Sequence, residues 1–409
     1  MTDQAAVRRS LRALFSPRGC PDPYPHYAVL REHAPVARLP DGTVVVSRHA
    51  DCDRMLRDPV FRVEDDEWIA RTWPEGREHL TVFSLMGEMV NQNSPHHERL
   101  RRLVSRAFTP RRVAGLRPAV TALVENLLTA LAERAGPDRP IDFMTHFALP
   151  LPIAVIGELL GIPEADRPWF APRVQAVTSA IEQNLTGAAL DRADEATAEL
   201  WDRLGKLTEL RQADPREDLI STLIAVRDAD GDRLTRRELL ANLVLLYSAG
   251  YETTSNLLGN GLAALLDRPA LLERLRGEPD RVSVWVEEML RFDPPIQIAS
   301  RWTGEDTELG GVRIPRGTQV VALLASANRD PERQPDPDVF LPDRPPTSSL
   351  TFGAGAHYCL GAALARLEAQ VAFPLLLKRF PSISLAGDGA ARDRVTSLRG
   401  HARLPLLMS

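Results

Sequence analysis

The segment Phe352-Gly353-Ala354-Gly355-Ala356-His357-Tyr358-Cys359-Leu360-Gly361 stands directly before a helical pattern over 362–380. A cysteine at a helix N-terminus meets the positive end of the helix dipole and unpaired backbone N–H groups, which favour its thiolate. Gly353 and Gly355 permit a tight loop whose N–H groups can point at the sulfur, and Gly361 leaves bare backbone where a planar macrocycle could lie. The segment therefore indicates a thiolate suited to hold haem iron, whereas a lone cysteine is usually inert.

Two other ligand types fit this segment poorly. Zinc would need more ligands than His357 and Cys359, and no second pair stands at finger or ribbon spacing, while Cys20 and Cys52 are isolated. A phosphate loop would need a third glycine, or a Lys-Ser/Thr pair, after Gly353-Ala354-Gly355. Neither pattern is present.

A long helix is predicted before this loop. Thr235-x-x-Glu238 is a capping box, and the helical pattern continues to Asp267, where Arg268-Pro269 ends it. About 32 residues at 1.5 Å each give roughly 48 Å. Residues 239–249 are apolar on nearly every side, which indicates a helix threaded through the centre of a domain.

The middle of that helix reads Ala249-Gly250-Tyr251-Glu252-Thr253-Thr254. Glycine inside a helix costs about 1 kcal/mol relative to alanine, so this segment suggests a function. Gly250 would let a flat ligand approach the backbone, Thr253 could turn its hydroxyl onto the carbonyl four residues earlier, and Glu252 could relay protons. The alternative is a solvent-facing Glu252 beside tolerated threonines.

Two weaker patterns involve charged residues. Glu288 and Arg291 are an i, i+3 pair on a predicted helix, and exposed pairs of this kind contribute only about 0–1 kcal/mol. His97 and Arg101 share a helix face four residues apart, and Arg301 follows a strand-like run. A solvated helix face is the alternative for His97 and Arg101.

Composition limits the possible partners and compartment. The 409 residues carry 50 basic and 55 acidic side chains, and this mild acidity argues against a nucleic-acid partner. Three widely spaced cysteines exclude a disulfide framework and favour a reducing cytoplasm. The longest apolar run, 147–156, is too short for a bilayer, so no membrane association is expected.

Patterning predicts a mainly helical chain. Apolar positions recur at helical spacing over 95–273, with breaks near 110, 136, 161, 172 and 187. Short strands are expected on both sides of the Asp41-Gly42 turn, over 36–39 and 43–47, and again over 296–302, 308–314 and 319–323. Without repeats or a flexible linker, we expect one continuous domain over 1–409.

Taken in order, these segments resemble the bacterial branch of the cytochrome P-450 family, the haem-thiolate monooxygenases. Residues 352–361 fit its haem loop, 249–253 its oxygen-activation motif, and Glu288 with Arg291 its Glu-x-x-Arg helix, whose buried network Arg344 would complete. The resemblance implies a mainly α fold with small β-sheets, the cytochrome P-450 fold. Haem b would lie between the long central helix and the helix after the cysteine loop.

The resemblance also implies residue roles. Cys359 would bind the iron, and Thr253 with Glu252 would deliver protons to dioxygen. His97, Arg101, Arg301 and His357 would hold the haem propionates, with His96 an alternative to His97. The full set of implied cofactor contacts is His97, Arg101, Ala249, Gly250, Arg301, Phe352, Gly353, His357 and Gly361.

The implied activity is oxidation of a bulky apolar small molecule. The enzyme would take electrons from a ferredoxin and its reductase, and hydroxylate or epoxidise a secondary metabolite such as a macrolide, polyketide or peptide in antibiotic biosynthesis. A cytoplasmic monomer is expected. The alternatives are an oxidative coupling or peroxide-driven haem enzyme and a non-catalytic haem ligand carrier or sensor.

Family comparison also implies substrate contacts. They would come from the loop 61–90, from 169–186, and from Leu245, Ala249, Gln297, Ile298 and Leu398. The aromatic and methionine side chains of the first loop suit an apolar lid over a bulky ligand, or ordinary packing.

Overall fold

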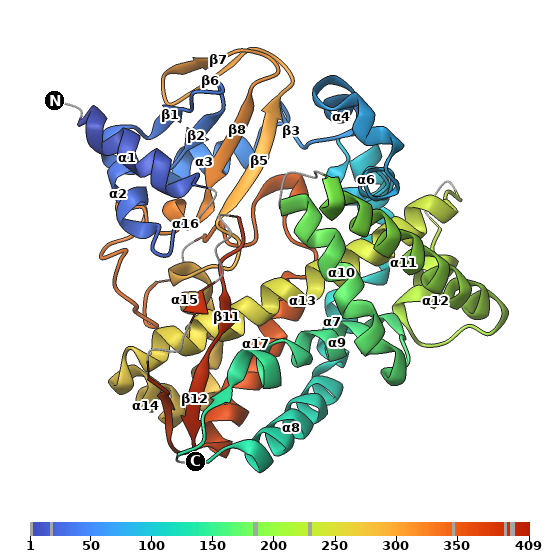
Figure 1. The fold of residues 1–409 in the computed structure, drawn as a ribbon, viewed down its shortest axis with the longest axis vertical. Coiled ribbons are helices and arrows are strands. Elements are labelled where there is room, and N and C mark those ends of the chain that lie inside the picture. Colours follow the sequence, from blue (N-terminus) through green and yellow to red (C-terminus); the bar gives the residue numbers. More distant parts are fainter. Residues whose placement is uncertain are drawn as a thin grey trace. The chain divides into compact units, whose positions relative to one another are not determined.

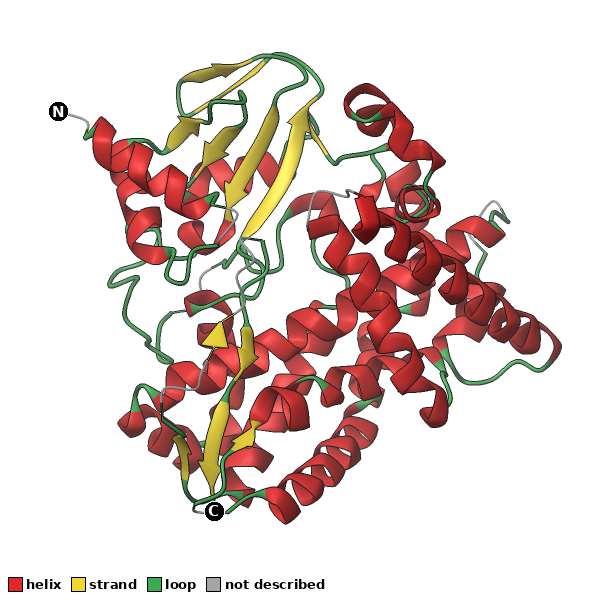
Figure 2. Ribbon diagram, viewed as in Figure 1, coloured by secondary structure: helices red, strands yellow, loops and turns green. Residues whose placement is uncertain are grey.

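The computed structural model describes residues 3–16, 19–136, 138–182, 187–227, 231–345, 348–387, 391–392 and 397–409. Helices make up most of the described chain, and the strands are short (Figure 2). The chain divides into two compact units. Unit 1 comprises 1–62, 124–149 and 253–409, and unit 2 comprises 63–123 and 150–252. The single domain over 1–409 stays a prediction.

Unit 1 contains a five-stranded sheet in the order β1-β2-β8-β5-β3. The Asp41-Gly42 turn joins β1 and β2 as an antiparallel hairpin with Val36 opposite Val46, and Gly42 has the positive φ of 91° that this turn uses. β2 pairs with β8 in parallel, and β5 pairs antiparallel with β8 and β3. The strands are β1 (Val36–Arg38), β2 (Val44–Val46), β3 (Phe61–Arg62), β5 (Ile298–Thr303) and β8 (Gln319–Leu323).

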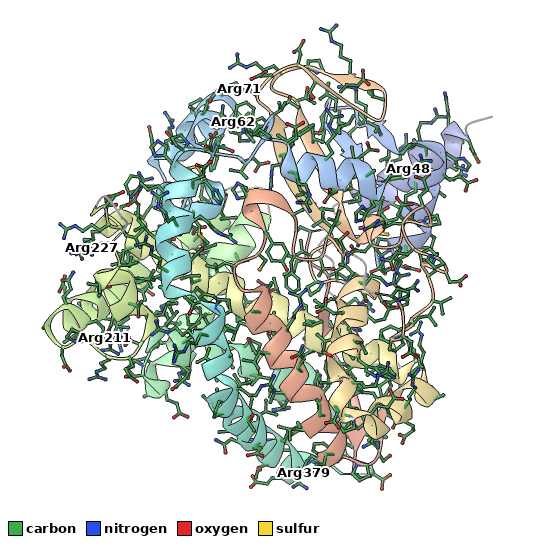
Figure 3. All side chains as sticks on the ribbon, turned by 180° about the vertical axis from the view of Figure 1, so that it is seen from behind. Arg48, Arg62, Arg71, Arg211, Arg227 and Arg379 are labelled. Carbon is green, nitrogen blue, oxygen red and sulfur yellow. The ribbon has the colours of Figure 1, made fainter. Side chains whose placement is uncertain are left out.

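Both faces of this sheet are covered. Val45, Val321 and Leu323 pack with side chains of α1 (Gln4–Leu14) and α2 (Tyr24–His33), whereas Val44, Val46 and Val320 pack with α3 (His49–Arg57). Alternating residues of one strand point to opposite faces, which explains this division. Figure 1 shows these helices beside the sheet. At the sheet edge, the Arg62 guanidinium, labelled in Figure 3, lies 4.6 Å from the centre of the Trp302 ring.

The rest of unit 1 is built from helices and three smaller sheets. The helices are the second parts of α8 (Arg117–Arg134) and α13 (Arg236–Leu266), η3 (Met144–Ala148), α14 (Pro269–Gly277), η5 (Pro279–Arg281), α15 (Val282–Phe292), α16 (Leu324–Ala327), η6 (Gly355–His357) and α17 (Ala362–Arg379). The strands are β4 (Ile141–Asp142), β6 (Thr307–Leu309), β7 (Val312–Ile314), β9 (Ile383–Leu385), β10 (Ala391–Arg392), β11 (His401–Arg403) and β12 (Pro405–Met408).

The described residues of unit 2 form helices and the loops between them, without strands. It comprises α4 (Asp66–Thr72), η1 (Pro74–Glu78), α5 (Leu80–Leu85), η2 (Met89–Asn91), α6 (His96–Ala107), α7 (Pro110–Gly115), α9 (Pro150–Leu160), η4 (Glu164–Asp166), α10 (Arg167–Glu182), α11 (Gly187–Ala213) and α12 (Leu219–Ala225), with the first parts of α8 and α13. None of the helices in the described part of the chain combines the length and apolar character that crossing a bilayer requires.

The predicted long helix is α13, and its N-terminus has the predicted capping box. The Thr235 backbone N–H donates to Glu238 Oε2 at 2.8 Å, and the Glu238 N–H donates to Thr235 Oγ1 at 3.2 Å. These two bonds satisfy N–H groups that the helix itself leaves without partners.

One predicted helix boundary is wrong. Pro172 lies inside α10 and does not end it. Proline removes one helical hydrogen bond, but Phe170 and Val174 on either side are buried, so packing outweighs the local preference.

Candidate active site

The cysteine loop of unit 1 folds back on itself before α17. The Cys359 backbone N–H donates to the Phe352 carbonyl at 2.9 Å, and the Tyr358 N–H donates to the Gly355 carbonyl at 3.1 Å. Gly353 and Gly355 have φ values of 70° and 68°, which side chains rarely adopt. A Cβ on Gly355 would also lie 2.6 Å from the carbonyl oxygen of Leu56 in α3. The loop therefore needs glycine at 355 for two reasons.

Cys359 is the cysteine best placed to bind a metal. Its residue is exposed, whereas Cys52 is fully buried and Cys20 partly buried. Burial raises the pKa of both the Cys52 and the Cys20 thiol, which disfavours their thiolates. Over the described residues, no group of three or more His, Cys, Asp or Glu side chains could hold a metal. A single thiolate fits an iron whose other ligands are supplied mainly by a macrocycle, and does not fit zinc.

The loop is anchored by a residue that sequence analysis missed. Arg366, on the second turn of α17, lies with its guanidinium 4.4 Å from the Phe352 ring centre. The same guanidinium donates to Glu287 of α15, at 3.1 Å from Nη2, and to the Tyr358 hydroxyl at 3.4 Å. The position of Arg366, seven residues after Cys359 on the predicted helix, could have indicated a contact with the loop. Its pairing with Glu287 could not be predicted, because Glu287 is remote in sequence. Together these contacts hold both ends of the loop against α15 and α17.

Glu288, Arg291 and Arg344 come together in unit 1. Both Glu288 oxygens accept from Arg291 at 2.7 Å, and Arg344 Nε lies 3.7 Å from Glu288 Oε2. Their side chains are 3–5% exposed. Arg291 and Arg344 also donate to backbone carbonyls of the segment 335–339, and Glu288 accepts from the Leu341 N–H at 2.6 Å. This network ties α15 to a segment without regular structure.

The centre of α13 is open on one side. Ala249 is exposed, and Ser248, Gly250, Glu252 and Thr253 are half-buried, although the residues before and after them are mostly buried. A long helix with buried flanks and an accessible middle can border a ligand site. A Cβ on Gly250 would lie 3.1 Å from Cδ1 of Ile156 in α9, and the contact of Gly250 with the cofactor stays a prediction. Its missing side chain therefore makes room for α9.

The predicted cationic residues lie in both units. In unit 2, His97 on α6 is 3% exposed, its neighbour His96 is exposed, and Arg101 is half-buried one turn further along. In unit 1, Arg301 lies on β5 and donates to the Ser300 carbonyl at 2.7 Å, and His357 ends η6. The burial of His97 favours it over His96 as a residue that faces the interior.

The predicted substrate contacts differ in how accessible they are. Leu245 on α13 and Ile298 at the start of β5 are half-buried, whereas Leu398 is 8% exposed and its backbone forms a bridge with Ile296. Gln297 is 2% exposed, accepts from the Tyr27 hydroxyl at 3.2 Å and donates to the Pro294 carbonyl at 2.7 Å. Its amide is thus used within unit 1. Of the predicted tip 169–186, positions 183–186 lie outside the described residues.

Comparison with known proteins decides the family. Residues 58–389 match the family described as cytochrome P-450. The chain belongs to the cytochrome P-450 family. It is 40% identical to a vitamin D(3) 25-hydroxylase of Pseudonocardia autotrophica, over 97% of this chain and 96% of that protein, and 41% identical to the cytochrome P-450 monooxygenase PikC of Streptomyces venezuelae, over 89% and 85%.

Solved structures agree with this family. The cytochrome P-450 PksS of the Bacillus subtilis 168 bacillaene polyketide synthase superposes with a TM-score of 0.85 at 35% identity, over 95% of this chain and 97% of that chain. The predicted cytochrome P-450 fold, mainly α with small sheets, is confirmed. The protein is a cytochrome P-450 monooxygenase with haem b as its cofactor, it acts on a small molecule, and it needs redox partners.

Proposed function

We propose that this cytochrome P-450 hydroxylates or epoxidises a bulky apolar secondary metabolite of the macrolide, polyketide or peptide class. The observation that carries the proposal is Cys359, exposed on a loop that glycine geometry and Arg366 hold in place. The names of PikC as a monooxygenase, of PksS within a polyketide synthase and of the vitamin D(3) 25-hydroxylase support oxidation of large apolar molecules.

The chain's residues would divide the work of the reaction. Haem, when bound, supplies the activation of dioxygen and the oxidising power. Cys359 Sγ would hold the iron, and the 2.9 Å bond from its backbone N–H would fix the position of its Cα. His97, Arg101, Arg301 and His357 would bind the two carboxylates of the cofactor by charge-assisted hydrogen bonds.

Proton delivery would come from the accessible part of α13. The Thr253 hydroxyl would donate a proton from Oγ1 toward dioxygen. The Glu252 carboxyl would then pass a proton from water back to Thr253 Oγ1. Both residues are half-buried, which suits groups that contact both a closed site and water. Leu245 and Ile298 would contribute apolar contacts with the substrate.

A ferredoxin and its reductase are the proposed electron donors, and the cytoplasm is the proposed compartment. The resemblance to the bacterial branch of the family supports a ferredoxin donor, and the three described cysteines form no disulfide, which is compatible with a reducing compartment. A monomeric state is part of the same proposal.

The experiment is a spin-state titration followed by turnover. The ferric holoenzyme is titrated with a panel of macrolides, polyketides and peptides, because displacement of water from the iron reports ligand binding directly. Compounds that bind are then incubated with dioxygen, ferredoxin, reductase and nicotinamide cofactor, or with peroxide alone. We expect a product containing one added oxygen atom in the first reaction. Binding without product would indicate a carrier, and product with peroxide alone a peroxide-driven enzyme.

A further inference from the structure

Asn242 on α13 bonds to the backbone of a distant loop segment in unit 2. Its Oδ1 accepts from the Met89 N–H at 3.0 Å, and its Nδ2 donates to the Gly87 carbonyl at 3.2 Å and to the Glu238 carbonyl at 2.7 Å. The side chain is fully buried, and it is the one polar side chain in the run 239–246. Because hydrogen bonds are directional, the two bonds to the loop fix both its distance from α13 and its orientation.

A glycine lets the same segment lie directly on α13. A Cβ on Gly87 would lie 3.0 Å from the Cβ of Ala241 and 3.1 Å from the Ser84 carbonyl oxygen, so a larger residue at 87 would have to shift the backbone. Steric fit and the Asn242 hydrogen bonds therefore specify one position for the backbone at 87–89.

The part of the segment that precedes Gly87 has anchors of its own. The Thr81 N–H donates to Oδ1 of Asp194 in α11 at 2.8 Å, and Nε1 of Trp201 in α11 donates to the Ser84 hydroxyl at 3.1 Å. These bonds hold α5 without involving α13. Loss of the Asn242 amide would therefore release the backbone at 87–89 and leave α5 in place.

The segment 87–89 lies at one end of the face of α13 that carries predicted substrate contacts. Asn242, Leu245 and Ala249 stand at i, i+3 and i+7, which puts them on one face of the helix. Exposure increases along this face, from fully buried Asn242 through half-buried Leu245 to exposed Ala249. Seven residues at 1.5 Å each put Ala249 about 10 Å along the axis from Asn242. A long ligand on this face would therefore reach the segment 87–89, whereas a small ligand at Ala249 would not.

We propose that Asn242 is a positioning residue, which holds the backbone at 87–89 as a preformed wall at one end of the substrate site. A wall that is already in place needs no ordering when the ligand binds, and this raises the affinity for every ligand long enough to reach it. Asn242 acts through the segment and contacts no reacting atom. The inference rests on the proposed function, which gives Leu245 a contact with the substrate.

The test measures the binding of ligands of graded length. The probes are 1-alkylimidazoles from 1-methylimidazole to 1-dodecylimidazole, whose free ring nitrogen binds the ferric iron and changes its absorbance without turnover. The proteins are the wild-type holoenzyme, Asn242→Leu, Gly87→Ala and the control Asn91→Leu. Asn91 Nδ2 donates to the Leu85 carbonyl at 3.0 Å, so the control removes an amide bond that stays within the same segment. Hydrogen exchange of the Met89 amide reports the position of the segment independently of the haem.

We expect Asn242→Leu to weaken the binding of 1-dodecylimidazole roughly three- to tenfold and that of 1-methylimidazole less than about twofold. Gly87→Ala should act in the same way, and the Met89 amide should exchange faster in both variants. Asn91→Leu should keep the wild-type ratio of the two affinities. Gly87→Ala decides the matter if Asn242→Leu loses its haem.

Three results would overturn the role of Asn242 and leave the proposed function standing. They are equal weakening of long and short probes, a loss for the long probe that is as large in Asn91→Leu, and unchanged exchange of the Met89 amide in Asn242→Leu. If the wild-type holoenzyme bound no imidazole of any length, its iron would be closed to ligands, and the proposed function would fall together with this inference.

Discussion

Removal of the charge on Glu288 should destabilise the enzyme strongly. Glu288→Gln keeps the shape of the side chain but leaves two guanidiniums, of Arg291 and Arg344, without a carboxylate. All three side chains are 3–5% exposed, so water cannot replace the lost partner. Breaking a buried ion pair by removing one member costs about 3–5 kcal/mol. We expect the free energy of unfolding to fall by that amount.

The measurement is urea unfolding of the holoenzyme, followed by circular dichroism and by haem absorbance. With a slope of about 3 kcal/mol per M, the midpoint should fall by about 1 M or more. The control is Glu287→Gln on the same helix, whose pair with Arg366 is 49% and 28% exposed and should contribute less than about 1 kcal/mol. Equal shifts in the two variants, or a loss below about 1 kcal/mol in Glu288→Gln, would refute the reasoning.

Three further outcomes are expected. Gly355→Ala should lower haem retention and stability by more than Gly353→Ala. Both glycines have positive φ, but a Cβ on Gly355 would lie 2.6 Å from the Leu56 carbonyl oxygen, whereas a Cβ on Gly353 would lie 4.0 Å from its nearest neighbour, the His357 carbonyl oxygen. Equal losses of haem absorbance would contradict this. Burial lowers the pKa of His401 to about 4, so the neutral imidazole should contribute up to about 3 kcal/mol to the free energy of unfolding above pH 6.5, and this contribution should be lost as pH falls toward 4. His401→Leu should therefore flatten the acid side of the curve of urea midpoint against pH. An unchanged curve would contradict this prediction. Thr253→Ala should uncouple electron consumption from product and release peroxide, measured as the ratio of product to nicotinamide cofactor consumed, and full coupling would remove the role proposed for the hydroxyl.

Local patterns predicted the elements that depend on nearby residues. The capping box of Thr235 and Glu238, the hairpin at Asp41-Gly42 and the strand 319–323 are all present, because each is determined by side chains within a few positions. The tight turn of the cysteine loop was likewise predicted from its glycines, but the close approach of Gly355 to Leu56 in α3 was not.

Features that depend on distant residues were not readable. Gly250 was interpreted as a surface for a flat ligand, which stays a prediction, and its closeness to Ile156, nearly a hundred positions earlier, could not be predicted. Two further contacts join segments far apart in sequence. One is the ion pair of Arg366 with Glu287, and the other is the pair of hydrogen bonds between Asn242 and the backbone of Gly87 and Met89. Single-residue patterns carry no information about such neighbours.

The role of Cys359 can be measured most directly by X-ray absorption at the iron edge of the ferric holoenzyme. The wild type should show one sulfur atom bound to iron, and Cys359→His, which can still hold haem through nitrogen, should show none. A wild-type protein whose iron has no sulfur ligand, or a variant that keeps one, would contradict the assignment of Cys359 as the thiolate that holds the haem.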